Sequence, residues 1–272
     1  YYGDGSQLTG AGPTLTNGAN NRIVTATGAN ALNAQANLTY NGATITHNVT
    51  GGLAKLDIKG SVGGGALGAS ISLRNTNSAN NGKTELQFQD PGSNVYAKIE
   101  GTNLTDGSNN GEIRFYTASA TQGVTERLKI SQEGYVTKPA HPTFDVCGSS
   151  GNPNASSGSV YITYNTVKIN NGNHYSTSTG KFTVPVAGLY FFSFGCIKSG
   201  NNNLARLHLH KNGSSANDRH LRMATGQDGY GENGALTNII SCAVGDEIQV
   251  WLQEGVLHAG TAYLYFNGFL IG

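Results

Sequence analysis

The stretch Phe182–Phe194, FTVPVAGLYFFSF, decides the fold of this chain. It places Tyr190, Phe192 and Phe194 at every second position, and the side chains of a β-strand alternate between its two faces. The three rings therefore share one face, and Gly188 just before them permits a turn. We expect this segment to be a deeply buried strand of a β-sandwich.

The spacing F-x5-G-x-Y-x-F-x-F of this stretch resembles the signature of the globular head of complement component one, subcomponent q. That family shares a trimeric jelly roll with the tumour necrosis factors. The resemblance implies that the matching residues form the core and trimer seam of such a head. The matching residues come from the stretch itself and from the family's upstream and closing segments. They are Tyr164 (where the family has Phe), Asn170, Tyr175, Phe182, Gly188, Tyr190, Phe192, Phe194, Trp251, Phe266, Gly268 and Phe269.

Other segments extend this resemblance over residues 140–272. Thr143–Val146 stands where the family has its first strand. Val244–Leu252 resembles the family's Gly-Asp turn and following apolar strand, and Phe266–Ile271 resembles its closing strand. The resemblance implies a C-terminal jelly-roll β-sandwich that assembles as a homotrimer.

The composition favours a folded all-β protein over a disordered one. Glycine accounts for 39 of 272 residues and charged residues for only 12%, but the chain has 13 Tyr and 9 Phe in alternating patterns. The net charge is +1 with no basic run, which argues against nucleic acid as a partner. There is no apolar run of about 18 residues and no signal peptide, so we expect no membrane insertion.

We predict three regions. Residues 1–46 are rich in Gly, Asn and Thr and resemble the low-charge repeats in fibres of tailed phages, particularly marine and cyanobacterial ones. Residues 47–138 predict a β-sandwich or interleaved β-prism, hence a β-rich trimeric shaft, and residues 139–272 form the head. Thr125–Pro139, TERLKISQEGYVTKP, resembles the end of a phage fibre shaft before a knob.

Short alternating runs predict the strands of the middle region. They are Leu53–Lys59, Ala69–Arg74, Thr84–Gln89, Val95–Ile99, Glu112–Thr117 and Glu126–Ile130. Helical periodicity is nearly absent, and Ala29–Leu38 is the best helical candidate, although Gly and Asn flank and interrupt it.

The three cysteines, Cys147, Cys196 and Cys242, show no paired spacing. We expect them to be reduced and to behave as small buried apolar residues. One bridge between Cys196 and Cys242 remains an alternative, because both lie at the ends of predicted strands.

Two candidate metal sites are weaker than their structural alternatives. His208 and His210 lie on one strand face with His220 as a third ligand, but no acid or thiol stands at ligand spacing. The loop from Thr225 to Asn233 offers several oxygens for calcium, yet an ordinary hairpin loop explains it. We therefore expect no metal and no cofactor.

No convincing catalytic set occurs, so we predict that the chain is not an enzyme. Glycoside hydrolysis needs two placed carboxylates, and the acids here lie mostly in turns. The chain has no G-x-S-x-G elbow, and Gly60–Gly65 lacks the Gly-Lys-Ser/Thr of a phosphate loop.

Polar loops of the head are the candidate receptor-binding surface. An aromatic ring beside amide and hydroxyl groups is typical of carbohydrate recognition, and Tyr230 stands in such a loop. The candidate residues are Asn201, Asn202, Asn203, Asp228, Tyr230 and Glu232.

The leading hypothesis is a structural virion fibre protein of a tailed phage, a homotrimer whose C-terminal knob drives trimerisation. The knob would bind a host-surface glycan or protein, and the N-terminal end would bind other virion proteins. An alternative is an extracellular bacterial surface or filament protein that uses the same head for assembly. A eukaryotic head-domain lectin would require a collagen-like Gly-X-Y stalk, and residues 1–138 contain none.

Overall fold

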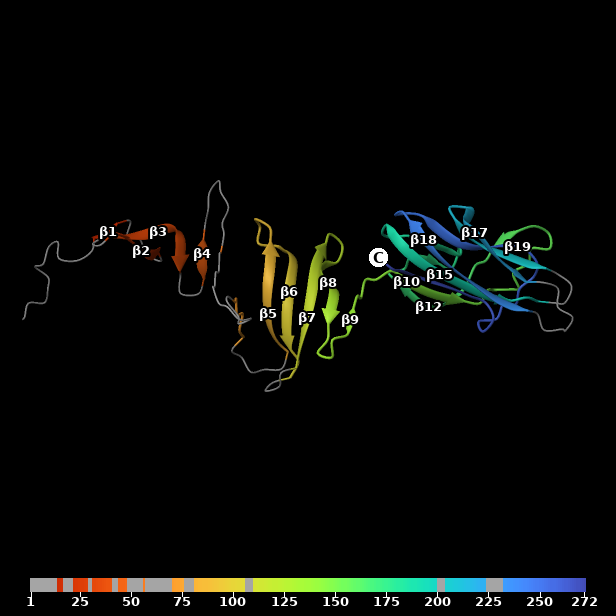
Figure 1. The fold of residues 1–272 in the computed structure, drawn as a ribbon, viewed down its shortest axis with the longest axis horizontal. Coiled ribbons are helices and arrows are strands. Elements are labelled where there is room, and N and C mark those ends of the chain that lie inside the picture. Colours follow the sequence, from red (N-terminus) through yellow and green to blue (C-terminus); the bar gives the residue numbers. More distant parts are fainter. Residues whose placement is uncertain are drawn as a thin grey trace, which may run out of the picture. The chain divides into compact units, whose positions relative to one another are not determined.

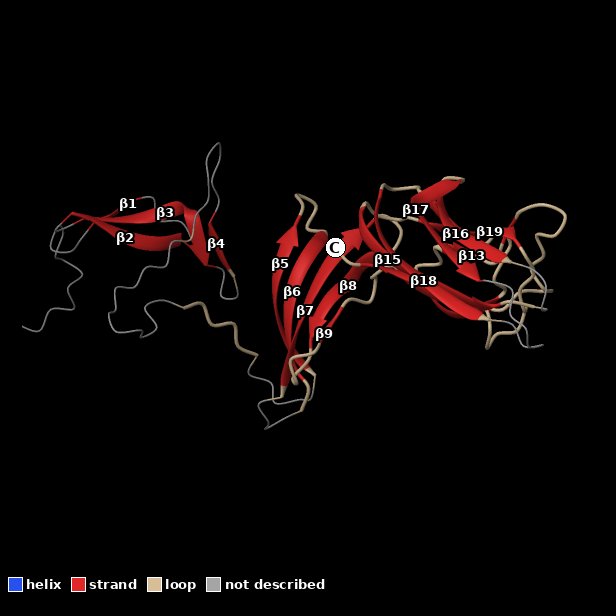
Figure 2. Ribbon diagram, turned by 45° about the vertical axis from the view of Figure 1, so that its right-hand side comes forward, coloured by secondary structure: helices blue, strands red, loops and turns tan. Residues whose placement is uncertain are grey.

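The chain is described by a computed structural model, which covers residues 14–16, 22–28, 31–40, 44–47, 56, 70–75, 81–105, 110–199, 204–223 and 232–272. The regular elements of these residues are all strands, and none of the described segments is helical (Figure 2). The prediction of an all-β protein is confirmed. The chain divides into two compact units, Tyr1–Ser72 and Leu73–Gly272.

The N-terminal unit contains one small sheet built around a ten-residue strand. Its strands are β1 (Thr14–Thr16), β2 (Arg22–Gly28), β3 (Ala31–Tyr40) and β4 (Ile45–His47). β3 pairs with β1 in parallel and with β2 and β4 antiparallel. The helix predicted at Ala29–Leu38 is therefore wrong for its described residues 31–38. Their backbone hydrogen bonds go to neighbouring strands, because strand pairing outweighs a weak helix propensity.

The second region forms one antiparallel sheet in the order β5-β6-β7-β8-β9. Its strands are β5 (Gly82–Gln89), β6 (Val95–Asn103), β7 (Gly111–Ser119), β8 (Gly123–Ile130) and β9 (Val136–Thr137). They follow one another side by side as a meander (Figure 1). The described residues of this region form a single layer and not a sandwich.

Four of the six strands predicted for this region are confirmed, namely those in β5, β6, β7 and β8. The strand predicted at Ala69–Arg74 is wrong for its described residues 70–74, which are exposed and outside any sheet. Alternation alone does not make a strand when no neighbour accepts its backbone hydrogen bonds. Of the strand predicted at Leu53–Lys59, all but Leu56 lies outside the described residues.

The head is a sandwich of two antiparallel sheets (Figure 1). One has the order β12-β10-β20-β15-β18; the other has the order β13-β14-β19-β16-β17, with β11 also paired to β19. The strands are β10 (Thr143–Cys147), β11 (Val160–Tyr161), β12 (Thr166–Asn171), β13 (Tyr175–Ser176), β14 (Lys181–Thr183), β15 (Gly188–Ile197), β16 (Ala205–Lys211), β17 (Ser214–Met223), β18 (Asn233–Cys242), β19 (Glu247–Glu254) and β20 (Tyr265–Leu270). This is the predicted jelly-roll arrangement.

An aromatic core fills the space between the two sheets. Tyr190, Phe192 and Phe194 of β15 are fully buried, which confirms the burial predicted for this strand. Phe144 from β10 stacks on Phe182 with ring centroids 4.6 Å apart and meets Phe266 edge-on at 4.8 Å. Offset and edge-to-face pairs at such distances stabilise a core beyond the area they bury.

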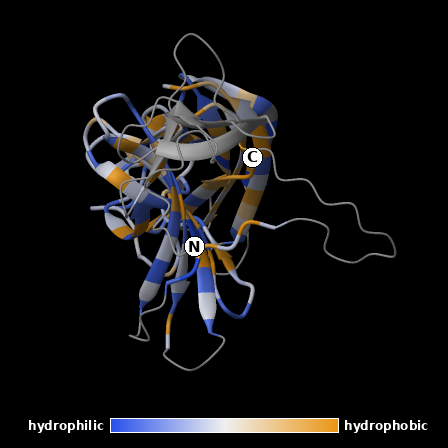
Figure 3. Cartoon of the chain, turned by 90° about the vertical axis from the view of Figure 1, so that its left-hand side faces the viewer, coloured by the Kyte–Doolittle hydropathy of each residue, from blue (hydrophilic) through white to orange (hydrophobic). Residues whose placement is uncertain are grey.

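Alternating hydropathy accounts for both architectures. Hydrophobic and hydrophilic residues succeed one another along the strands (Figure 3). In β19, Ile248, Val250 and Leu252 are fully buried, whereas Trp251 between them points away from the core. Alternation gives each sheet of the head one apolar face. These two faces pack against each other and form the core of a sandwich.

Candidate functional site

Among the described residues of the sandwich, the large exposed apolar side chains gather mainly on the outward face of the five-stranded sheet. Several large apolar side chains from different strands are exposed there, although strand alternation usually places polar residues on such a face. They are Val167 and Ile169 of β12, Leu189 of β15, Ile239 of β18 and Phe269 of β20, with Ile271 just beyond β20.

Strand register aligns part of this surface into one row. Phe269 of β20 lies opposite Phe191 of β15, and Phe191 lies opposite Ile239 of β18. The rings of Phe191 and Phe269 stack with centroids 5.2 Å apart. Phe269 is 42% exposed and Ile239 57% exposed. The row is therefore held in place within the chain while it presents apolar area to its surroundings.

The next row along the same face is polar. It runs from Asp145 of β10 through Asn267 and Ser193 to Thr237 of β18. Beyond it, the ring of Tyr265 lies across Gly195, where a Cβ would stand 2.5 Å from the ring carbon Cζ. The face thus combines an apolar row with neighbouring groups that can form directional hydrogen bonds.

We define the assembly face as the apolar residues Val167, Ile169, Leu189, Phe191, Ile239 and Phe269. Of these, only Phe269 is among the site residues predicted from the sequence. The missed signal was the alternate register of the decisive stretch, since Leu189 and Phe191 lie between the buried rings of β15 and point the other way.

The upstream signature residues hold the chain between β10 and β14. The Asn170 side chain donates to Tyr175 O at 2.9 Å and accepts from Tyr175 N at 3.0 Å. The Tyr175 hydroxyl accepts from Tyr164 N at 3.1 Å and donates to Tyr164 O at 3.3 Å. Burial raises the pKa of Tyr175 to about 12, so this hydroxyl keeps its proton. Within one chain these residues therefore fix the backbone conformation of the segment through hydrogen bonds.

The closing segment places its three signature residues differently. Phe266 is fully buried, and Gly268 is buried where a Cβ would lie 2.8 Å from Phe191 O and 2.9 Å from Phe144 Cε1. Phe269 faces outward on the assembly face. Trp251 lies on the other sheet and faces away from both the core and the assembly face, because its neighbours Val250 and Leu252 occupy the inward positions.

Trp251 is part of an imidazole cluster on the outward face of the six-stranded sheet. The ring of His210 lies 4.6 Å from it, and His208 lies 5.4 Å from both Trp251 and His220. His208 Nε2 is 2.9 Å from Gln253 Oε1, and His210 Nδ1 is 3.1 Å from the Tyr161 hydroxyl. Burial and the neighbouring His208 lower the pKa of His210, which favours its neutral form.

No group of three His, Cys, Asp or Glu side chains within the described segments is arranged to hold a metal ion. The imidazole cluster is therefore a packed polar surface, with two of its ring nitrogens engaged by Gln253 and Tyr161. The proposed calcium loop lies outside the described residues except for Glu232 and Asn233.

The cysteines are free and buried. Cys196 lies opposite Gly234, whereas Cys242 lies opposite Gly188, at the other end of the β15–β18 ladder. Eight residues of strand span about 27 Å, far beyond the reach of a disulfide. The alternative of a Cys196–Cys242 bridge is therefore wrong. Burial raises the pKa of Cys196 to about 12 and that of Cys242 to about 11, so both are unreactive thiols.

Most residues of the candidate receptor-binding loops lie outside the described part of the chain. Asn201, Asn202, Asn203, Asp228 and Tyr230 lie outside the described residues. Glu232 is described and exposed, and its carbonyl oxygen accepts from Lys198 N at 3.0 Å. Receptor binding through these loops stays a prediction.

In the described part of the chain, no helix is both long and apolar enough to cross a membrane.

Comparison with known proteins agrees with the geometry of the head. Residues 144–271 match the family model of the C1q domain. Complement C1q tumor necrosis factor-related protein 3 is 30% identical over 111 residues in both mouse and human, covering 40% of this chain and 44% of the relative. The match thus spans less than half the length of these curated relatives.

Among solved structures, the chain is similar to the globular domain of zebrafish complement 1qA protein and to murine APRIL. The first is 21% identical with a TM-score of 0.36 and covers 48% of this chain and 98% of the other. The second is 11% identical with a TM-score of 0.38 and covers 48% and 99%. The family match over residues 144–271 thus confirms a C1q-like head, as the decisive stretch predicted.

Proposed function

We propose that the chain is a structural, non-enzymatic protein that assembles as a homotrimer through the assembly face of its C1q-like head. The observation that carries this proposal is the row of Phe269, Phe191 and Ile239, which is apolar, preorganised by stacking and exposed in the single chain. Contiguous exposed apolar surface of this kind marks a protein–protein interface. The C1q-domain match supports the choice of a closed assembly of identical copies.

The test is the mass of the full chain in solution before and after a charge is placed on this face. A trimer of the 28.3 kDa chain has a mass of about 85 kDa. Phe269→Glu introduces an unpaired carboxylate into the interface, so we expect monomers at micromolar concentration. Multi-angle light scattering after chromatography measures this directly.

Tyr161→Glu is the matched control. The Tyr161 side chain is 39% exposed, an exposed fraction similar to that of Phe269. It lies on β11, in the opposite sheet. We expect this variant to keep the mass of the parent chain. A parent chain that is monomeric, or a Phe269→Glu variant that remains trimeric, contradicts the proposal.

We further propose that this trimer is a fibre of a tailed-phage virion, attached through its N-terminal end to other virion proteins. The support is the all-β sheet of residues 82–137, the lack of collagen-like Gly-X-Y repeats in residues 1–138, and the resemblance of Thr125–Pro139 to the end of a phage fibre shaft. Its knob would contact a host-surface glycan or protein through the loops around Glu232. Several fibres per particle would turn weak single contacts into firm attachment.

Antibodies raised against the head test this assignment by electron microscopy. We expect them to label fibres on phage particles. Labelling of the envelope of uninfected bacteria would instead support the alternative of a bacterial surface protein. Binding of the purified chain to a glycan array, and its loss on Glu232→Ala, tests the receptor surface.

A further inference from the structure

The sheet β5–β9 has one face that is apolar and uncovered within the described residues. Strand register places the residues of this face in rows, for example Leu86, Ile99, Phe115 and Leu128 across four strands. Leu86 is 52% exposed. We define the apolar sheet face as Leu86, Phe88, Ala97, Ile99, Ile113, Phe115, Leu128, Ile130 and Val136.

The opposite face of the same sheet is charged and internally neutralised. Four acidic and four basic side chains lie together on it. The acids are Glu85, Glu100, Glu112 and Glu126, and the bases are Lys83, Lys98, Arg114 and Lys129. The Glu100 carboxylate is fully buried, accepting from Lys98 Nζ at 2.6 Å and lying 3.1 Å from Lys83 Nζ. Removing such a paired network from water costs more than it returns, so this face favours solvent.

The apolar sheet face has the reverse character. Within the described residues, charged side chains reach this face only near its rim. Arg127 at the β8 bulge donates to Thr117 Oγ1 at 3.0 Å, and Arg74 lies beside Gly101 and Ile113 at one end. A single amphipathic sheet leaves its apolar side in water unless a second layer covers it. The asymmetry identifies the side on which a covering layer binds.

We propose that the covering layer is the same face of other copies of this chain, so that the sheets close around the trimer axis below the heads. This inference rests on the proposed trimer. Only residues 138–142 separate β9 from β10, a tether of at most about 18 Å. Asn171 Nδ2 of the head donates to both Pro139 O and His141 O at 2.7 Å. Heads that assemble thus hold the sister sheets at high effective concentration.

The size of the face also favours sister copies over an independent partner. Four long strands spaced by about 4.8 Å and about 27 Å long give a face of roughly 500 Å². A stable interface between two proteins buries about 800 Å² on each partner. The apolar sheet face is therefore too small to bind a free partner firmly, but sufficient once the head has joined the copies.

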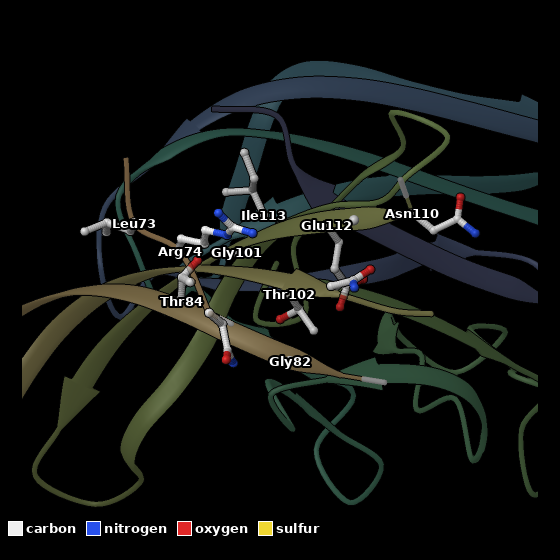
Figure 4. Close-up of a pocket in the computed structure, with 12 residues that line it drawn as sticks. Leu73, Arg74, Gly82, Thr84, Gly101, Thr102, Asn110, Glu112 and Ile113 are labelled. Carbon is white, nitrogen blue, oxygen red and sulfur yellow. The ribbon is translucent and has the colours of Figure 1, made fainter. Parts of the chain in front are cut away.

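A hollow at one end of the apolar sheet face can receive side chains from a neighbouring copy. Gly82, Gly101 and Gly111 leave a cavity of about 480 Å³ there. Leu73 and Ile113 are its large apolar lining residues, and the rest of the lining is mostly polar, including Arg74 and Glu112. Figure 4 shows Leu73 and Arg74 near Thr84, Gly101 and Ile113. A hollow of this size can receive a side chain of a neighbouring copy with an apolar stem and a polar end, as interfaces with complementary shape require.

Cysteine labelling of the full chain tests the inference. Ile113→Cys places a thiol on the apolar sheet face at a position 46% exposed in the single chain. Ala118→Cys places one on the same strand, exposed on the opposite face. If copies cover the apolar sheet face, Ile113→Cys reacts about tenfold more slowly or less with a thiol reagent than Ala118→Cys. The parent chain supplies the background from its three buried cysteines.

The mass measured on the same samples separates the possible failures. A trimer whose two thiols react at equal rates overturns this inference and leaves the head-driven trimer standing. A monomer whose two thiols react equally overturns both. A monomer with a protected Ile113→Cys thiol also overturns it, because then another part of the same chain covers the face.

Charge rescue identifies sister copies as the covering layer. Three-fold symmetry places the same residue of each copy at the same height, so Ile113→Lys and Ile113→Glu chains should each lower the melting temperature alone and recover in mixed trimers. Ala118→Lys and Ala118→Glu are the matched controls and should melt like the parent in every mixture. Mixed Ile113 trimers that melt no higher than their components overturn the inference.

Discussion

The head and the sheet of residues 82–137 are both antiparallel and alternate in hydropathy, yet only the head encloses its apolar residues within one chain. Phe144, Phe182 and Phe192 are almost fully buried between the two sheets of the head. In the single sheet, Phe88 and Leu86 remain 41% and 52% exposed. The head thus carries its own core, whereas the described residues of the sheet leave its apolar face uncovered.

Stabilising interactions differ in kind between the two regions. The head depends on ring packing and on backbone ties such as Asn170 to Tyr175. The sheet, in contrast, is stabilised in part by a buried network of ion pairs around Glu100 on its polar face. Substitutions in the two regions should consequently respond differently to volume, charge and pH.

The largest expected effect is that of Phe192→Ala in the head core. Phe192 is fully buried and contacts the rings of Phe182 and Tyr190 at 5.8 and 5.9 Å between centroids. Its removal leaves a cavity and should lower the free energy of unfolding by about 3–5 kcal/mol. Chemical denaturation followed by tryptophan fluorescence reports on the head through Trp251. Tyr135→Ala, at a residue 70% exposed, should change it by no more than about 0.5 kcal/mol.

Glu100→Gln should be the next largest effect and should act on the sheet. Desolvation raises the pKa of Glu100, but hydrogen bonds from Lys98, Lys83 and Tyr116 outweigh it and lower the pKa to about 2. Losing these charge-assisted bonds should cost about 1.5–3 kcal/mol at pH 7. Hydrogen exchange of β6 and β7 measures it locally.

The same carboxylate sets an acid limit for the sheet. Because its pKa is lower in the folded chain than the ordinary 4.5, its contribution is present above pH 4.5 and lost as the pH falls toward 2. We expect Glu100→Gln to remove this part of the pH dependence. Glu232→Gln, at an exposed position of the head, is the control for neutralising a carboxylate outside this network. An unchanged acid limb in Glu100→Gln would show that other groups dominate.

Gly268→Ala tests the close approach of β20 to the core of the head. The new methyl group would lie 2.9 Å from Phe144 Cε1 and 2.8 Å from Phe191 O. Overpacking of this kind should cost about 1–3 kcal/mol, measured as a lower melting temperature. Gly151→Ala has no atom within 4 Å of its new Cβ and should melt like the parent. Equal melting of the two variants would refute the close packing at Gly268.

The smallest expected effect is a mild acid sensitivity of the head. Burial, together with His208, lowers the pKa of His210 below its ordinary 6.5. The unfolded chain then binds more protons, so stability should be full above pH 6.5 and decrease as the pH falls toward the folded pKa. The slope is at most about 1.4 kcal/mol per pH unit for one group. His210→Gln should flatten melting curves between pH 5 and 7; a slope that persists in this variant contradicts the assignment.

Local patterns predicted the head well because its rings obey strand alternation and also meet partners. Tyr190, Phe192 and Phe194 were placed on one buried face by spacing alone. The same reasoning could identify Phe191 as pointing outward, but not that Phe269 and Ile239 would align with it, since that depends on strand register across residues distant in sequence. Asn201 and Tyr230 in the candidate loops stay predictions.

Local sequence patterns gave wrong predictions where secondary structure depends on which strands pair with a segment. Ala31–Tyr40 became a strand through its three neighbours, and residues 70–74 stayed outside any sheet despite alternating. Both cases turn on which segment accepts the backbone hydrogen bonds, and propensity does not contain that information.

By itself, the sequence determined that this protein is all-β, that Phe182–Phe194 contains a buried strand, and that its cysteines are buried, because these follow from alternation and composition. The C1q-like head followed from the resemblance of this stretch to a family signature. Only the tertiary structure decided which apolar residues remain uncovered. Register brings Phe191, Phe269 and Ile239 into one exposed row, and Leu86 and Ile113 have no second sheet over them among the described residues. Side-chain burial is set by what packs opposite a strand, and in the head that second sheet comes from residues distant in sequence.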